Sequence, residues 1–449
     1  MKPLRAGAAR SILTPALGAH IAGYFEDRVA QDVHDQLCAK ALVLESGDTS
    51  LAIVVCDLIS LQLADTDRAK ALAQEQTGIP ASRIFISATH THFGPTTSHG
   101  ANTMGEMDYL DWVPGRIADS IGLAQNRLRP ASLAHAAGAC PGECHNRRYL
   151  MKDGTVVTNP GYMNPEIVRA AGPTDPEVGL LVIIGEDRDP IAALANYSLH
   201  YVGGASGAAS SPREGGTPVD LSITADYFGA FELALQRMAG CDLVAIMMNG
   251  CCGDINNIDV FHPAPAGPDP WHQIYRVADV VAAATFQAWR GLHTTDFHQT
   301  VALGAADDRF VFRRRQFTPE QVAAAKQRAK AESPRNLGDR EWLEAHTTIE
   351  LSQRPPAQET LIQALRIGEV GLVGLPGEMF VEIGLEIKQR SPFRQTLVGE
   401  LANDWLGYIP TPRAFEEGSY EVYTTPAGPS TAPAMIASAL GLLGRLAEA

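Results

Sequence analysis

Short apolar runs, separated by polar or glycine-rich segments, make up most of the chain. The clearest run, residues 51–59, is apolar apart from Asp57, which is typical of a strand covered on both faces. Further runs that predict strands cover residues 37–44, 180–184, 191–199, 243–248, 359–367, 370–375 and 397–405. Helical periodicity covers residues 64–76, 108–128, 226–238, 271–292, 318–353 and the stretch from about 433 onward. Interleaved strands and helices predict a mixed α/β fold. No internal repeat, low-complexity linker or composition shift marks a boundary, so we expect residues 1–449 to form one domain.

Two histidines end the strand that begins at Ile84. Because side chains alternate between faces along an extended chain, His90 and His92 are expected to point the same way, with Thr91 opposite. Two imidazoles beside a Gly-Pro turn can start a zinc site, since neutral imidazole nitrogen is a common zinc ligand. The same pattern also fits two polar residues that only close a strand.

Two more strand ends carry residue types that bind metals. His200 follows the run at 191–199, and Glu378 stands between the run at 370–375 and a predicted helix. Each also has a structural interpretation, because a single histidine at a strand end is usually structural and a first-turn carboxylate stabilises a helix dipole. Asp57 fits either a partner for a histidine or a cap for the next loop.

Small residues gather after the run at 243–248. They would let backbone N–H groups around Gly253 approach a ligand, an arrangement suited to an oxyanion or a carbonyl. Cys251 and Cys252 lie in the same turn, but the sequence offers neither of them a dedicated base. Cys140 and Cys144 lack a second pair of that kind, which argues against a structural zinc there.

The net charge of the chain limits the kinds of molecule that it is expected to bind. There are 51 acidic residues against 36 basic ones, a formal net charge of −15. This excludes a broad nucleic-acid surface and stable anchoring on an anionic membrane, both of which need clustered Lys and Arg. The one basic run, at 313–315, is interpreted as a solvated turn. The sequence shows neither a signal peptide nor a bilayer-spanning run, and its cysteines number an odd seven. We therefore expect a cytoplasmic protein with a small-molecule substrate; oligomeric state stays open.

Several motifs, in this order, together resemble the catalytic domain of the neutral/alkaline (non-lysosomal) ceramidases. The most specific is Ser87-Ala88-Thr89-His90-Thr91-His92-Phe93-Gly94-Pro95. The others are weak singly and persuasive jointly: Gly23-Tyr24, Asn146-Arg147, His200, Ala225-Asp226, Gly253-Asp254, Pro376-Gly377-Glu378, Gly407-Tyr408 and Tyr420. They cover essentially the whole chain.

The resemblance implies a mixed α+β domain of stacked β-sheets flanked by helices, with one Zn²⁺ per chain. Carried over residue by residue, the zinc ligands would be His90, His200, Glu378 and Tyr408. His92 and Arg147 would face the scissile group, and Tyr420 would line the same pocket. The substrate and oxyanion loop would contain Gly253, Asp254 and Asn256. Manganese or iron could also occupy a mixed nitrogen–oxygen set.

Two departures from the ceramidase pattern bear on the substrate. Asn256 stands where ceramidases carry a serine, and the chain ends near the close of the catalytic domain, without the C-terminal immunoglobulin-like domain. The sequence therefore resembles a shorter bacterial relative. We expect a zinc-dependent hydrolase that cleaves an amide with a metal-activated water, on a small soluble substrate rather than a long-chain lipid. The same site could serve an ester, a lactone or a sugar derivative. An alternative of another class is a non-catalytic binding protein that keeps the metal.

Overall fold

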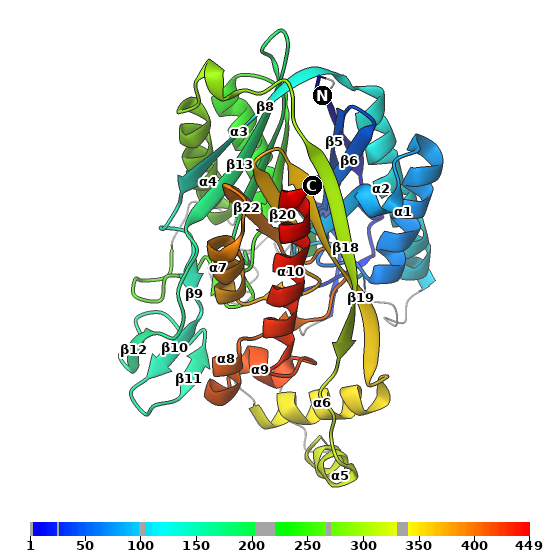
Figure 1. The fold of residues 1–449 in the computed structure, drawn as a ribbon. Coiled ribbons are helices and arrows are strands. Elements are labelled where there is room, and N and C mark those ends of the chain that lie inside the picture. Colours follow the sequence, from blue (N-terminus) through cyan, green and yellow to red (C-terminus); the bar gives the residue numbers. More distant parts are fainter. Residues whose placement is uncertain (1–2, 25–26, 98–103, 203–220, 266–270, 330–339) are drawn as a thin grey trace.

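Two β-sheets stacked face to face, with helices on both outer faces, form the body of the molecule (Figure 1). The computed structural model describes residues 3–24, 27–97, 104–202, 221–265, 271–329 and 340–449. The expected mixed α/β fold with stacked sheets is confirmed.

The larger sheet has eight strands. Their spatial order is β16 (Val244–Asn249), β14 (Pro190–Tyr197), β13 (Glu177–Gly185), β8 (Arg129–Ala139), β1 (Arg5–Ile12), β5 (Cys38–Ser46), β6 (Thr49–Cys56) and β7 (Ile84–Ala88). Only the two outermost pairs, β14–β16 and β6–β7, are parallel. Each of these pairs is joined through a helix, as parallel pairing requires a crossover connection.

The smaller sheet has four strands. Their order is β18 (Leu303–Arg313), β19 (Ala357–Ile367), β20 (Val370–Gly374) and β22 (Gln395–Gly399), and here too the parallel pair, β20–β22, is joined by a helix, α7 (Val381–Arg390). Leu365, Leu372 and Leu397 from this sheet pack against the inner face of the larger one.

Alternation along the strands assigns each side chain to one layer. On β6, Ile53 and Val55 enter the core between the sheets, while Ala52 and Val54 face the helices. Phe85 on β7 packs tightly against the smaller sheet, because a Cβ added to Gly374 would come within 2.4 Å of its ring. Both faces of the larger sheet are therefore buried, which explains the nearly continuous apolar runs in the sequence.

Helices cover the two outer faces. The larger sheet is covered by α1 (Leu63–Thr77), α2 (Met104–Asn126), α3 (Asp226–Ala239) and α4 (His272–Arg290). The smaller sheet is covered by α10 (Thr431–Glu448) and α7. Gly78 ends α1 in the left-handed conformation, with φ of 74° and its N–H bonded to Gln74 O. The predicted helical segment at 318–353 forms α5 (Pro319–Arg328) and α6 (Arg340–Gln353), which pack against each other at the edge of the molecule (Figure 1).

Short elements complete the described part of the chain. The strands are β2 (His20–Ile21), β3 (Arg28–Val29), β4 (Asp32–Val33), β9 (His145–Asn146), β10 (Arg148–Met151), β11 (Val156–Thr158), β12 (Ile167–Ala170), β15 (Ser222–Ile223), β17 (Ile255–Asn256), β21 (Glu378–Met379) and β23 (Tyr408–Ile409). The helices are η1 (Ala81–Arg83), η3 (Thr294–Asp296), α8 (Pro412–Glu417) and α9 (Tyr420–Thr424). Several of these short pieces build the candidate site below.

The structure corrects four local interpretations. The strand expected at 397–405 ends at Gly399, because Leu401 and Asn403 have positive φ. Asp57 contacts no histidine among the described residues; it accepts a hydrogen bond from Cys38 N and lies 3.7 Å from Lys40 Nζ. In the basic run, Arg314 and Arg315 are only partly exposed and donate to backbone carbonyls. The long strands β8 and β18 were not foreseen.

No helix among the described residues is long and apolar enough to cross a bilayer.

The contact between the sheets leads to a stability prediction. Replacing Phe85 with alanine should lower the free energy of unfolding by about 3–5 kcal/mol, because it empties a fully buried site. Phe261, which is 54% exposed, is the matched control, and Phe261→Ala should cost less than about 1 kcal/mol. Urea unfolding followed by circular dichroism measures both. Equal losses in the two variants would contradict the assigned core.

Candidate metal centre and active site

One end of the two stacked sheets collects the polar residues singled out in the sequence. His90 follows β7, and His200 follows β14. From the smaller sheet, Glu378 follows β20 and Tyr408 lies beyond β22, and the two residues pair in the short parallel bridge β21–β23. The segments that follow these strands converge, so parts of the chain about 300 residues apart in the sequence meet there.

The imidazole of His90 is fixed by the backbone of a neighbouring segment. Its Nδ1 lies 2.7 Å from the carbonyl oxygen of Ile59 and donates to it, which leaves Nε2 facing Glu378. Burial would lower the pKa of His90, but the Glu378 carboxylate outweighs burial and raises it, so Nε2 can carry a proton when no metal is bound. The expectation that His90 and His92 lie on an extended strand is wrong. β7 ends at Ala88, and His90 has a left-handed φ of 71°. His90 and His92 nevertheless converge, with ring centroids 4.9 Å apart, through a left-handed turn rather than strand alternation.

His92 and His200 face each other directly. Their Nε2 atoms are 2.9 Å apart, and the ring of His200 lies 4.6 Å from that of His90. One ligand atom from each of the three buried histidines can be chosen so that all three lie within 4.8 Å of one another. Burial lowers the pKa of His92 and of His200 well below the usual imidazole value, so both rings are neutral.

Gly23 sets the position of His92. Its φ is +100°, and an added Cβ would lie 2.6 Å from the His92 ring. Tyr24 follows and places its ring edge-on to His92, with centroids 5.7 Å apart. Only glycine fits against the imidazole here, which explains the Gly23-Tyr24 motif in physical terms.

Glu378 completes the cluster from the other sheet. Its Oε2 lies 3.4 Å from His90 Nε2, and its Oε1 accepts a hydrogen bond of 3.0 Å from the indole of Trp405. Burial opposes the charged carboxylate, but the facing His90 ring and the Trp405 bond lower its pKa below the usual value. Glu378 therefore presents an oxygen toward the histidines.

The residues fit a metal of the zinc type. Glu378 Oε2 is buried without a hydrogen-bond partner within the normal distance among the described residues, and it lies 3.4 Å from His90 Nε2. A metal bound between these two atoms would take the place of the proton on His90 Nε2, and imidazole nitrogen with carboxylate oxygen is a zinc donor set. His200 adds a condition: Arg147 can only donate to its Nδ1, so the ring proton lies on Nε2, and a metal bound there would replace this proton.

Arg147 is buried beside the histidines. Its Nη1 lies 3.2 Å from His200 Nδ1, its Nη2 donates to Gly253 O at 2.7 Å, and its Nε donates to Glu421 at 2.8 Å. Burial alone would lower its pKa, but the Tyr408 phenol and the Glu421 carboxylate outweigh burial and raise it. The guanidinium is therefore a fixed positive charge at the edge of the cluster.

Tyr408 lies beside this guanidinium, and Tyr420 packs on Tyr408. The rings of Tyr408 and Tyr420 meet edge to face with centroids 5.6 Å apart, and Arg147 Cζ is 5.3 Å from the centre of the Tyr408 ring. Burial raises the pKa of Tyr420 to about 12 and that of Tyr408 well above its usual value. Both hydroxyls keep their protons, so a bound cation would be needed to make Tyr408 a phenolate ligand.

The loop at Gly253, Asp254 and Asn256 is buried and bonded within the fold. The Gly253 N–H donates to Met379 O at 2.7 Å, so it supports the strand of Glu378. Asp254 accepts from Val381 N and from Asn146, and burial raises its pKa to about 6. Asn256 donates to the side chain of Asn159 and accepts from Ile258 N. The loop acts on the site by holding Arg147 and Glu378.

The neighbouring cysteines are inert thiols in this environment. Burial raises the pKa of Cys251 and of Cys252 well above the usual value. The Cys252 thiol donates to Glu400, whose carboxyl also accepts from Cys252 N and Met379 N. All seven cysteines are free thiols, and the Cys144 thiol donates a hydrogen bond to Cys140 O.

Three of the residues that organise the site were not foreseen: Trp405, Glu421 and Glu400. Trp405 and Glu421 stand next to segments that the motifs did identify, Gly407-Tyr408 and Tyr420. Glu400 carried a usable signal, since it directly follows a strand of the core. For Glu421 the sequence offered only its position beside Tyr420, because its partner Arg147 is 274 residues away.

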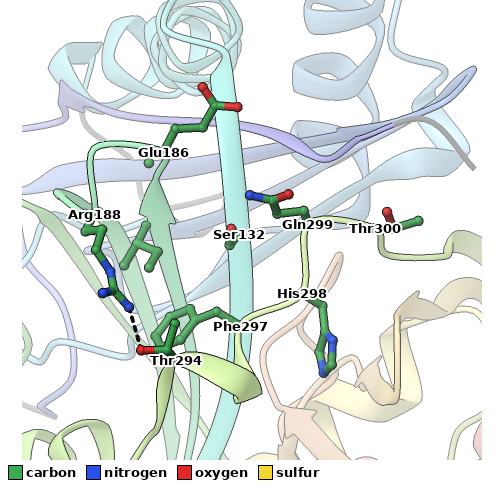
Figure 2. A pocket seen from close by; sticks show the side chains of 10 residues that line it. Ser132, Glu186, Arg188, Thr294, Phe297, His298, Gln299 and Thr300 are labelled. Atoms are coloured by element: carbon green, nitrogen blue, oxygen red, sulfur yellow. Dashed lines mark hydrogen bonds between the residues drawn. The ribbon is translucent and has the colours of Figure 1, made fainter.

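The pocket of Figure 2 lies at the opposite edge of the larger sheet. It has a volume of about 480 Å³ and is lined by Ile184 and Gly185 at the end of β13, with Thr294 and Phe297 beside them. Because β13 and β14 are antiparallel, this end of β13 is a full strand length from His200, roughly 25 Å for eight residues. Arg188 in this pocket donates to Thr294 (Figure 2). The pocket is separate from the histidine cluster.

The Trp405–Glu378 bond leads to a prediction about metal affinity. Trp405→Phe should weaken the binding of zinc by about ten- to hundredfold, because outer hydrogen bonds orient a ligating carboxylate. Competition against a chromophoric chelator measures the affinity, and Trp289→Phe, on α4, is the matched control. Unchanged affinity in Trp405→Phe would show that the indole does not hold Glu378.

Comparison with known proteins agrees with the motifs. No family model matches the chain. In sequence it is 23% identical to the neutral ceramidase of Pseudomonas aeruginosa, over 96% of this chain and 70% of that protein. The crystal structure of neutral ceramidase from Pseudomonas aeruginosa superposes on all of this chain and on 75% of its own, with a TM-score of 0.74 and 18% identity. A ceramidase complexed with C2 has the same TM-score and identity, with 76% of its chain covered. The resemblance to neutral ceramidases is thus confirmed over nearly the whole chain, and what the chain shares with the solved structures is their fold.

Proposed function

We propose that this protein is a zinc-dependent hydrolase that cleaves a carbon–nitrogen bond of the amide type. The observation that carries the proposal is the buried meeting of His90, His200 and Glu378 beside a fixed guanidinium. A purely structural zinc site would have no use for Arg147, because closed sites consist of four ligands and exclude reacting groups. The likeness in sequence to a neutral ceramidase points to the same bond type.

The metal would be held by His90, His200, Glu378 and Tyr408. The first three present nitrogen or oxygen atoms toward one another, and Tyr408 is the direct bridge partner of Glu378. His92 also lies within the histidine cluster, so it is the neighbour best placed to replace Tyr408 as a ligand. When bound, zinc would polarise the substrate carbonyl and lower the pKa of a water molecule to about 7.

The remaining side chains would transfer protons and stabilise the negative charge of the transition state. His92 is neutral and next to the proposed ligands, so it can accept a proton from the attacking water and pass it to the leaving nitrogen. Arg147 and the protonated hydroxyl of Tyr420 would donate to the oxygen that becomes negative in the tetrahedral transition state. The loop that contains Gly253, Asp254 and Asn256 would hold Arg147 and Glu378 in position.

The surroundings of the cluster and the net charge of the chain support the proposed substrate class. The polar groups Arg147, Tyr408 and Tyr420 gather on one side of the histidines, and the chain carries a net charge of −15. Both features favour a small polar acyl amide over a long-chain lipid at a negatively charged membrane.

A substrate panel tests the activity and its metal dependence. N-acyl p-nitroanilides of two, eight and sixteen carbons should be hydrolysed, with the short chains preferred. p-Nitrophenyl esters and a simple lactone are assayed in parallel. A chelator should abolish turnover, and added zinc should restore it. Turnover of esters or lactones alone would exclude an amidase, and turnover that survives complete metal removal would exclude the metal mechanism.

Variants of the three histidines separate ligands from the proton carrier. His90→Ala and His200→Ala should lose bound zinc and activity together. His92→Ala should keep most of the zinc and lose about 100-fold or more in kcat, since general acid–base catalysis contributes about 10²–10⁴-fold. Elemental analysis and kinetics on the same samples decide this. Loss of zinc in His92→Ala would make it a ligand, and a fully active His200→Ala would overturn the ligand set.

A further inference from the structure

Glu421 is a buried carboxylate that pairs with Arg147. It is 0% exposed, and its Oε1 accepts from Arg147 Nε at 2.8 Å. Its Oε2 accepts from the Thr158 hydroxyl at 2.8 Å, and Arg148 Nε lies 3.7 Å away. A buried charge is costly unless it is paired and hydrogen-bonded, and both conditions are met here.

These contacts determine the direction of the Arg147 guanidinium. The group is planar with five N–H donors, so two fixed donors on different nitrogens set its plane. Glu421 holds Nε and Gly253 O holds Nη2. The remaining edge of the plane is then directed at His200, and Arg147 Cζ lies 5.3 Å from the centre of the Tyr408 ring. Without Glu421 the side chain would keep one backbone acceptor and could rotate about it.

Thr158 in turn fixes Glu421. Its hydroxyl contacts both the Glu421 carboxylate and the Ser419 hydroxyl, each at 2.8 Å, and it ends β11. The carboxylate therefore has a second anchor outside the candidate site. Such supporting contacts hold a catalytic group within the small positional tolerance that charge stabilisation needs.

We propose that Glu421 is a positioning residue for the hydrolysis reaction, aiming the Arg147 guanidinium at the oxygen that becomes negative in the transition state. The inference rests on the proposed function. Among the described residues, Glu421 makes no hydrogen bond or ion pair with the histidines or with the proposed ligand Glu378, so it acts through Arg147.

A purely structural role of Glu421 predicts a different kinetic result from a positioning role. Glu421 lies in the first turn of α9, next to Tyr420, so its loss could simply loosen that helix. Loosening would lower the unfolding temperature and would add to the effect of any Arg147 variant. If Glu421 acts only by positioning Arg147, replacing Glu421 should not change kcat once Arg147 has been replaced, because the effects of interacting residues are not additive.

A double-mutant cycle tests the proposal. The variants are Glu421→Gln, Arg147→Met and the double variant, with Glu417→Gln as the matched control, since Glu417 pairs with Arg148 and Arg413 instead. The probe is the N-acyl p-nitroanilide that the wild type hydrolyses fastest. Zinc content and the thermal unfolding midpoint are measured on every sample.

We expect Glu421→Gln to lower kcat at least about tenfold, with KM within about threefold and zinc retained, because removing one oxyanion donor costs about 10²–10³. The double variant should fall within about twofold of Arg147→Met alone. The proposal is overturned if Glu421→Gln keeps wild-type kcat, or if the two losses multiply. An inactive wild type would instead count against the proposed function.

Thr158→Val keeps the test informative if Glu421→Gln does not fold. This change removes the second anchor of Glu421 and leaves Arg147 itself intact. It should lower kcat about threefold in the wild type and have no effect in the Arg147→Met background. An equal effect in both backgrounds would contradict the proposal.

Discussion

The site depends on the packing of one β-sheet on another at a single shared edge. His90 and His200 come from the larger sheet, and Glu378 and Tyr408 come from the smaller one. Small residues let the two layers approach: an added Cβ on Gly374 would strike the Phe85 ring, and one on Gly253 would lie 2.5 Å from Glu378 O. Since interiors are close-packed, a shift between the sheets would move carboxylate and imidazoles apart together.

This packing also explains why the polar cluster tolerates burial. Three groups of the cluster have a partner from another segment: Ile59 O for His90, Trp405 for Glu378, and Glu421 for Arg147. The remaining polar atoms of His90 and Glu378, Nε2 and Oε2, lie 3.4 Å apart within the cluster. In a site that receives a ligand, the outer polar atoms typically have hydrogen-bond partners within the protein, whereas the inner ones are left for the ligand.

Much of the fold could be predicted because the strands are apolar on both faces and the helices carry local end signals. Gly78 is an example, as its left-handed conformation ends α1 where the periodicity stops. The strand β8 was missed because its apolar residues are mainly alanines with polar interruptions. The end of β22 was misplaced because positive φ at Leu401 and Asn403 is enforced by contacts such as Lys70 Nζ to Asn403 Oδ1, which no local pattern reveals.

The candidate site could be predicted in part. Motif order identified the residues that the structure brings together, including His90, His200 and Glu378, whereas the reason offered for His90 and His92 was wrong. Strand alternation does not orient them; a left-handed turn does. The supporting residues Trp405 and Glu421 act across 27 and 274 positions, and such pairings are set by tertiary packing alone.

Anomalous diffraction at the zinc absorption edge tests the central claim most directly. Crystals of protein purified without added metal should show one strong peak per chain, about 2.0–2.2 Å from His90 Nε2, His200 Nε2 and Glu378 Oε2. A peak at another place, or no peak after soaking in zinc, would contradict the account.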